Sequence, residues 1–178
     1  MKKAAIGILF RNQKKEILIL KRRDIPIWVL PGGGIEQEET PENAVIREVW
    51  EETGLHVEVK QLLATYSPIN RLTALTFVFE CEVVSGNLTW GAETEELLFA
   101  PIDHLPKFFF FLHHAWVQDA LSNYPKPLHK TLNQITYFKA FLYFVRHPLW
   151  VMRYFFTRFC SYEECETSNK KEANRKKK

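Results

Sequence analysis

Residues 33–55 read GGIEQEETPENAVIREVWEETGL, and they constrain the fold more tightly than any other stretch of this 178-residue chain. Thr40 is a favourable N-cap, and Pro41 suits the first helical position, where its missing N–H would have no intrahelical partner. Gly54 can adopt the left-handed conformation that ends a helix. The spacing therefore predicts a helix that begins at Pro41 and ends near Thr53.

Three carboxylates share one face of this predicted helix. At 100° per residue, Glu48, Glu51 and Glu52 fall within an arc of about 100°. Their like charges repel one another, whereas their hard oxygens suit Mg²⁺ or Mn²⁺. The glycines at 32–34 allow backbone to approach a ligand closely. Together these features predict a phosphate anhydride bound through metal; the alternative for the carboxylates alone is a solvated acidic helix face.

The opposite face of the helix carries Ile46 and Trp50, which we expect to anchor the helix to a sheet. A fully buried tryptophan typically stabilises a fold by about 3–5 kcal/mol relative to alanine. The sequence therefore predicts that Trp50→Ala lowers the free energy of unfolding strongly.

The same stretch resembles the Nudix hydrolase family, whose box is G-x5-E-x7-R-E-U-x-E-E-x-G-U, with U a bulky aliphatic residue. The specified positions of that box all match, at Gly33, Glu39, Arg47, Glu48, Val49, Glu51, Glu52, Gly54 and Leu55. The resemblance extends to residues 28–34 before the box and to residues 93–106 after it. It therefore covers about residues 3–123.

The resemblance implies both a fold and a reaction. The fold is an α/β/α sandwich in which the box forms a loop, a helix and a second loop. The reaction is hydrolysis of a nucleoside diphosphate linked to another group, by water attacking a phosphorus. The small-molecule substrate stays open between nucleotide sugars, ADP-ribose-like dinucleotides and (deoxy)nucleoside triphosphates.

Carried over by position, the resemblance makes Glu48 and Glu52 the principal metal ligands and Glu51 a third ligand or the general base. Arg47 orients a neighbouring glutamate through a charge-assisted pair. Mg²⁺ is the expected cofactor, with Mn²⁺ as the alternative, since such a cation neutralises the diphosphate and lowers the pKa of a bound water. Gly33 and Gly34 are the candidate substrate contacts.

The resemblance also directs attention to a later acidic segment, because the general base of this family can come from a loop beyond the box. The candidates are Glu93, Glu95 and Glu96, of which Glu96 is our choice as a catalytic residue. The alternative for each of them is an ordinary surface carboxylate. Glu39, inside the box, is expected to be structural.

Two rival functions use the same scaffold. One is a catalytically silent nucleotide-binding or regulatory module, and the other is an isomerase that recognises a diphosphate without cleaving it. The complete set of Arg47, Glu48, Glu51 and Glu52 argues against the silent module, which would need no such set.

The rest of the sequence predicts an α/β domain with a mixed sheet. Apolar and alternating runs indicate strands at 4–10, 16–22, 27–30, 56–66, 72–84 and 96–100, and a second helix at 108–122. A hairpin at 12–15 joins the first two strands. We place the domain at residues 1–125, because Pro125 and Pro127 mark a boundary.

The chain changes character after residue 125. Residues 1–125 hold 12 Lys+Arg and 17 Asp+Glu, whereas residues 126–178 hold 12 and 4. Aromatic residues concentrate in the same region, where Pro148 separates two predicted short helices. We expect an aromatic, basic helical extension at 126–160 and a polar, disordered tail at 161–178.

Three interpretations of this extension stay open. It packs on the catalytic domain or forms a homodimer contact, with a solvated terminal tail. Alternatively, residues 126–178 bind an anionic membrane surface, since basic residues with Trp and Phe suit anionic headgroups. Contact with RNA or DNA is the least favoured of the three.

Composition and cysteine usage indicate a folded cytoplasmic protein. With 46% hydrophobic and 25% charged residues, the chain has the apolar content of a globular domain. Cys81, Cys160 and Cys165 fit no disulfide framework or zinc spacing, which favours a reducing compartment. No run reaches the ~18–20 apolar residues of a spanning helix, and residues 4–10 indicate a strand rather than a signal peptide. If the extension binds a membrane, we expect the cytoplasmic protein to be attached peripherally to that membrane.

Overall fold

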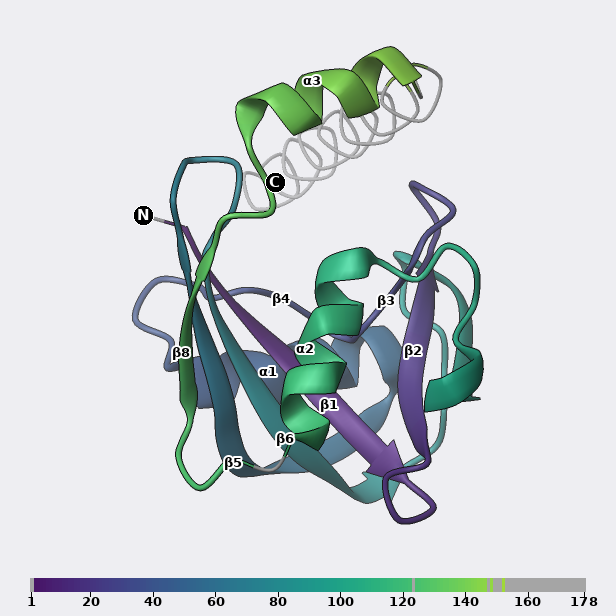
Figure 1. Cartoon of the computed structure of the whole chain (residues 1–178). Helices are drawn as coiled ribbons and strands as arrows, with labels where there is room; N and C mark the ends of the chain where they lie inside the picture. The colour runs from purple at the N-terminus through teal and green to yellow at the C-terminus, as the bar shows by residue number, and fades with distance from the viewer. Residues whose placement is uncertain (1, 123, 147, 149–151, 153–178) are drawn as a thin grey trace, which may run out of the picture. The chain divides into compact units, whose positions relative to one another are not determined.

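The computed structural model describes residues 2–122, 124–146, 148 and 152 (Figure 1). Its strands are β1 (Lys3–Arg11), β2 (Glu16–Arg22), β3 (Trp28–Val29), β4 (Gly32–Gly34), β5 (Leu55–Pro68), β6 (Leu75–Gly86), β7 (Thr94–Pro101) and β8 (Leu128–Leu132). Its helices are α1 (Pro41–Thr53), α2 (Phe111–Leu121) and α3 (Tyr137–Arg146), with a 3₁₀ turn at Ile102–His104. The chain divides into two compact units, one ending at Tyr137 and the other beginning at Phe138.

The strands of the first unit form one mixed sheet. Its order is β3-β2-β1-β6-β5-β8, with β4 paired to β1 and β7 paired to β2. β1 runs antiparallel to β2 and parallel to β6, while β5 runs antiparallel to β6 and parallel to β8. The mixed α/β fold expected from the sequence is therefore confirmed.

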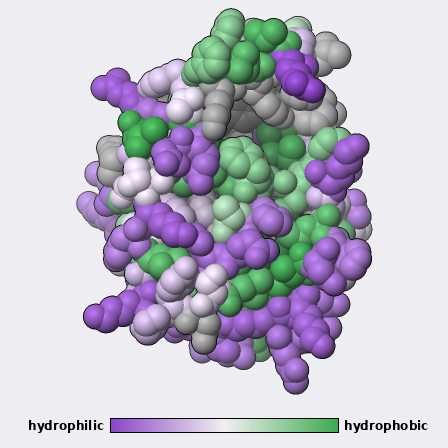
Figure 2. All heavy atoms as spheres, viewed as in Figure 1, coloured by the Kyte–Doolittle hydropathy of each residue, from purple (hydrophilic) through white to green (hydrophobic). Residues whose placement is uncertain are grey.

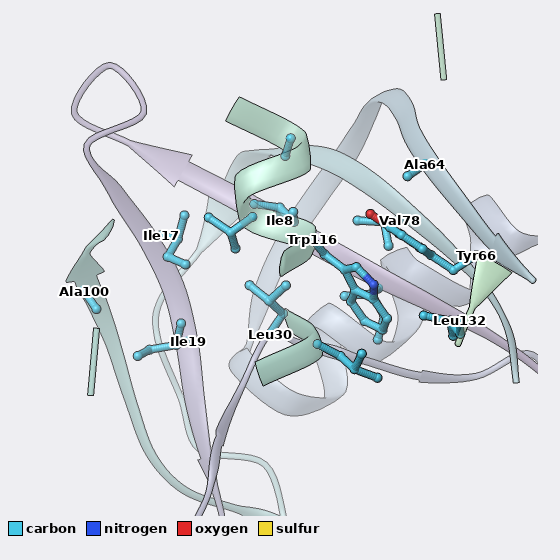
Figure 3. Packing of buried hydrophobic residues seen from close by; sticks show 14 residues of the cluster. Ile8, Ile17, Ile19, Leu30, Ala64, Tyr66, Val78, Ala100, Trp116 and Leu132 are labelled. Carbon is cyan, nitrogen blue, oxygen red and sulfur yellow. The ribbon is translucent and has the colours of Figure 1, made fainter. Parts of the chain in front are cut away.

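Helix α2 covers one face of this sheet (Figure 1). Ile6 and Ile8 of β1 belong to the same buried cluster as Trp116 and Val117 of α2. Figure 3 shows the Trp116 ring among side chains that come from β1, β2, β5 and β6. Because alternate residues of a strand point to opposite faces, the residues next to Ile6 and Ile8 in β1 point to the other face of the sheet.

Helix α1 covers that other face. Ala5 and Leu9 of β1 share a second buried cluster with Val45 and Val49 of α1. Both faces of β1 are therefore buried, which explains why its sequence is apolar almost throughout rather than alternating. The three layers give the α/β/α arrangement that the family resemblance implied.

Helix α1 begins and ends where the sequence predicted. The Thr40 side chain accepts a hydrogen bond from the Asn43 amide at 3.2 Å, and Pro41 is the first helical residue. Gly54 ends the helix with a φ of 72°, and its N–H donates to the Trp50 carbonyl at 2.8 Å. A residue with a Cβ would be strained at this left-handed position.

The prediction that Trp50 anchors α1 is wrong. Its side chain is 50% exposed, whereas Val45 and Val49 are fully buried against the sheet. The helix therefore packs through its small and β-branched residues, and Trp50 lies beyond the edge of that apolar stripe. Ile46 is partly buried in the same cluster, as expected. The Trp50 ring stacks near His56, with 6.2 Å between ring centroids.

Strand β8 was not predicted, because residues 128–132 fell in a segment expected to be helical. The strand pairs in parallel with β5, and Leu132 is buried. Tyr66 of β5 donates to Asp119 at 2.7 Å, and the same carboxylate accepts from Lys130 of β8 at 2.6 Å. The exposed edge of β5 gains backbone partners in this way, so the sheet continues past the Pro125–Pro127 stretch.

Beyond β8, α3 is helical as expected. The second predicted helix and the polar tail fall on residues 147, 149–151 and 153–178, outside the described residues. Cys81 is buried with a free thiol, while Cys160 and Cys165 also lie outside the described part. None of the helices in that part combines the length and the apolar character needed to cross a membrane.

Candidate active site

A cleft of about 530 Å³ opens beside the C-terminal half of α1. Three segments far apart in the sequence form its walls: the glycines of β4, the carboxylate face of α1 and the loop that leads into β7. Its lining residues are Arg22, Gly32, Gly33, Gly34, Glu48, Glu51, Glu52, Gly91, Ala92, Glu93 and Thr94. The three glutamates predicted to share one helix face, and both predicted glycine contacts, therefore meet in one cleft.

Glu52 is the most enclosed of these carboxylates. Its Oε2 accepts a hydrogen bond from the backbone N–H of Gly32 at 2.8 Å. Burial raises the pKa of Glu52 to about 8; the Gly32 N–H opposes this rise, and the negative charge of Glu48 adds to it. The ionised form of Glu52 is therefore disfavoured unless positive charge lies nearby. A bound cation would stabilise that ionised form.

Glu48 lies directly over Gly33. A Cβ on Gly33 would come within 2.5 Å of the Glu48 carboxylate, so a larger residue here would displace the end of that side chain. Burial raises the pKa of Glu48, and its contact with Arg47 works against that rise. Gly33 thus allows the Glu48 carboxylate to lie against the backbone of β4.

Arg47 joins the carboxylates into a network. Its guanidinium donates to both Glu39 oxygens at 2.9 and 3.0 Å, to Glu48 at 2.9 Å and to Glu51 at 3.2 Å. A further bond to the Gly34 carbonyl, at 3.0 Å, ties it to β4. Two hydrogen bonds from Arg47 lower the pKa of Glu39, which keeps this carboxylate ionised. Planar guanidinium geometry suits such multiple contacts, which a lysine could not reproduce.

The later carboxylates do not occupy equivalent positions. Glu93 lines the cleft, and its carboxylate lies 3.9 Å from the Arg22 guanidinium. Glu95 pairs with Lys21 at 2.8 Å. Glu96, although described, is not among the lining residues; it lies along β7, opposite Lys21 of β2. Glu96 therefore does not border this cleft, and its catalytic role stays a prediction.

Arg22 is a site residue that the sequence did not reveal. It lies at the end of β2 and donates two hydrogen bonds to Asp24, at 2.8 and 2.6 Å. A neighbouring bulge between β2 and β7 shifts the register at Lys21 and Arg22. No motif surrounds this arginine, and only the pairing of β2 with β7 brings it to the cleft. A guanidinium at this position could bind a phosphate oxygen.

The loop before β7 is fixed to the end of α1. Thr94 Oγ1 donates to the Glu52 carbonyl at 3.1 Å, and the Gly91 and Thr89 amides donate to the carbonyls of Glu52 and Thr53. These bonds satisfy carbonyls that a helix C-terminus leaves without intrahelical partners. The loop that carries Glu93 is thereby held against the carboxylate face.

The donor set can accommodate a divalent cation. Carboxylate oxygens are the ligands that Mg²⁺ and Mn²⁺ prefer, and Glu48 and Glu52 border the same cleft beside glycine backbone. Among the described residues, no three His, Cys, Asp or Glu side chains converge as a formed metal site. Glu48 and Glu51 instead contact Arg47, and Glu52 contacts Gly32. The ligand roles stay a prediction.

Comparisons with known proteins agree with this architecture. A family profile described as the NUDIX domain matches residues 1–120. An ADP-ribose pyrophosphatase of Methanocaldococcus jannaschii is 40% identical over 113 residues, which cover 60% of this chain and 66% of that protein. Two further curated relatives are covered over 51% and 40% of their lengths, so the chain spans between two fifths and two thirds of these proteins.

Solved structures resemble the fold over most of the chain. An ADP-ribose pyrophosphatase from Streptococcus suis matches with a TM-score of 0.60 at 23% identity, over 74% of this chain and 98% of that one. A NUDIX hydrolase from Nitrosomonas europaea matches with a TM-score of 0.64 at 21% identity, over 74% and 78%. At this level of identity the likeness shows a shared fold.

Proposed function

Because this chain belongs to the Nudix hydrolase family, we propose that it hydrolyses the diphosphate linkage of a nucleoside diphosphate derivative with the help of a divalent metal ion. One observation carries the proposal: the cleft brings Glu48, Glu51 and Glu52 together beside the glycines of β4. An acidic cleft of this size would repel a diphosphate unless cations were bound with it. The geometry therefore suits an anionic substrate only together with metal.

Members of this family generally need divalent metal ions. Here Glu48 and Glu52 would be the principal ligands, with Glu51 as a third, and Mg²⁺ is the proposed ion with Mn²⁺ as the alternative. Such an ion would neutralise charge on the diphosphate and make a water molecule more acidic. The raised pKa of Glu52 supports this role, since bound cation would favour its ionised form.

The remaining residues of the cleft would position the substrate and move a proton. Arg47 holds Glu48 and Glu51 in place, and Arg22 would bind a phosphate oxygen. For the general base we propose Glu93, which borders the cleft, in place of Glu96; Glu51 is the second candidate. Glu51 lies on α1, and Glu93 lies in the loop that hydrogen bonds to the end of α1.

For the substrate, we propose to begin with ADP-ribose-like dinucleotides. The support is the 40% identity to a protein named ADP-ribose pyrophosphatase. Nucleotide sugars and nucleoside triphosphates belong in the same panel, because no described cleft residue selects one base or sugar. A cytoplasmic location and a homodimer are further proposals that rest on the sequence alone.

Release of phosphate and nucleotide from this panel, with Mg²⁺, Mn²⁺ or EDTA, tests the proposal. We expect metal-dependent cleavage that Glu52→Gln lowers by about 100-fold or more, because a principal metal ligand is lost. Thermal unfolding should show that the variant keeps its fold. Glu82→Gln is the matched control, since Glu82 is exposed on β6 and pairs with Lys60 outside the cleft.

Near-normal turnover in Glu52→Gln would refute the assigned role of this carboxylate. Nucleotide binding without turnover in the unaltered protein would instead favour the silent module. Product analysis separates the isomerase, because an isomerase leaves the diphosphate linkage of its substrate intact.

A further inference from the structure

Helix α3 presents an apolar face to solvent. Phe138, Phe141, Leu142 and Val145 are 69%, 61%, 49% and 60% exposed. At 100° per residue these four side chains fall within an arc of about 100°, so they form one continuous strip. In Figure 2 the atoms of α3 are largely in the hydrophobic colour. Exposed apolar strips of this kind mark interaction sites far more often than isolated exposed residues do.

Positive charge accompanies this face. Arg146 lies in the last turn of α3 and is exposed. The sequence from residue 133 to residue 162 contains four Lys and Arg and neither Asp nor Glu. This segment therefore combines an aromatic and aliphatic face with a purely basic set of charges, which is complementary to a surface that is both apolar and anionic.

Three occupants of the face can be compared on chemistry. A second copy of α3 would bring the same positive charges together, which costs energy unless anions screen them. A nucleic acid would use the basic residues, but it offers nothing for Leu142 and Val145. An anionic bilayer accommodates both parts, because its acyl boundary accepts the apolar side chains and its headgroups pair with Arg and Lys.

We propose that α3 lies in the interface of an anionic membrane, with Phe138, Phe141, Leu142 and Val145 buried at the acyl boundary. The helix has 10 residues and is about 15 Å long, half of a bilayer's hydrocarbon thickness, so it lies in the surface rather than crossing it. The inference is independent of the proposed reaction. It concerns where the enzyme acts.

Co-sedimentation of the full-length protein with vesicles tests this inference. We expect binding to phosphatidylcholine vesicles that contain phosphatidylserine, and little binding to phosphatidylcholine alone. Phe141→Glu should weaken the binding about tenfold or more, because it places a charge within the apolar strip. Val84→Glu is the matched control: Val84 is 58% exposed on β6, so the same change of charge occurs away from α3. Its binding should equal that of the unaltered protein.

A second variant measures the electrostatic part. Arg146→Gln should weaken binding to the anionic vesicles about fivefold, and added salt should weaken it further. Hydrolysis in solution should be the same in all variants, which separates this test from that of the proposed function. Equal binding by Phe141→Glu and the unaltered protein would overturn the inference. So would an absence of binding to the anionic vesicles; concentration-dependent dimers or binding to RNA would then identify the alternative occupant.

Discussion

Helices α1 and α2 pack on opposite faces of the same sheet, but their remaining side chains serve different purposes. On α1, the residues that do not pack on the sheet include Glu48, Glu51 and Glu52, which border the cleft. On α2, the buried residues include Trp116 and even a histidine, His113. One helix therefore carries the candidate chemistry, while the other fills the core.

The difference explains why one helix could be interpreted from sequence and the other could not. The carboxylates of α1 occupy specified positions of the Nudix box, and that match indicated their role, whereas their charges alone would also fit a solvated helix face. Apolar residues such as those of α2 have many equivalent arrangements, and their spacing predicts only a buried helix. Substitutions on the two helices should accordingly affect different measurements.

The largest effect on stability is expected on α2. Trp116 is 5% exposed and stacks on Tyr66 and His113, with ring centroids 5.2 and 4.7 Å apart. Trp116→Ala should lower the free energy of unfolding by about 3–5 kcal/mol, through lost burial and the cavity left behind. Urea denaturation measures this change. A loss of stability no greater than that of Glu52→Gln would remove the contrast between the two helices.

His113 on α2 should make stability depend on pH. Its Nδ1 accepts a hydrogen bond from the Leu30 amide at 2.8 Å, so the folded protein holds the neutral ring. Burial lowers the pKa of His113 to about 3, and the positive charge of Arg22 contributes. In the unfolded chain the ring has its ordinary pKa of about 6.5. Between these two values the unfolded state binds the extra proton, so the contribution of His113 to stability falls as the pH falls. Glu52, whose pKa is raised to about 8, acts in the opposite direction over much of this range, so the contribution of His113 is obtained by comparing variants.

The slope of this dependence is at most about 1.4 kcal/mol per pH unit for one proton. Denaturation curves collected from pH 7 to pH 4 measure it. His113→Asn keeps an acceptor near the position of Nδ1 but cannot titrate, so its stability should depend less steeply on pH. His129→Asn, at an exposed position of β8, is the matched control. Identical slopes for the two variants would contradict the assignment to His113.

The sequence predicted α1 and its capping residues well, because Thr40, Pro41 and Gly54 act through local geometry. It could not predict which late glutamate reaches the cleft. That outcome depends on the pairing of β7 with β2, a contact between distant segments that also brings Arg22 to the site. Strand β8 was missed for the same reason, since its short run forms a strand only beside the edge of β5.

The smallest effect is expected on α1, at the residue whose burial was predicted wrongly. Trp50 is 50% exposed, so Trp50→Ala should change the free energy of unfolding by about 1 kcal/mol or less. Its neighbour Val49 is fully buried, and Val49→Ala should cost about 2 kcal/mol although it removes a much smaller group. Denaturation of both variants compares them directly. If Trp50→Ala were the more damaging, the indole would have to be packed far more tightly than its exposure indicates. The size of a side chain therefore predicts its contribution only after the face of the helix that it occupies is known.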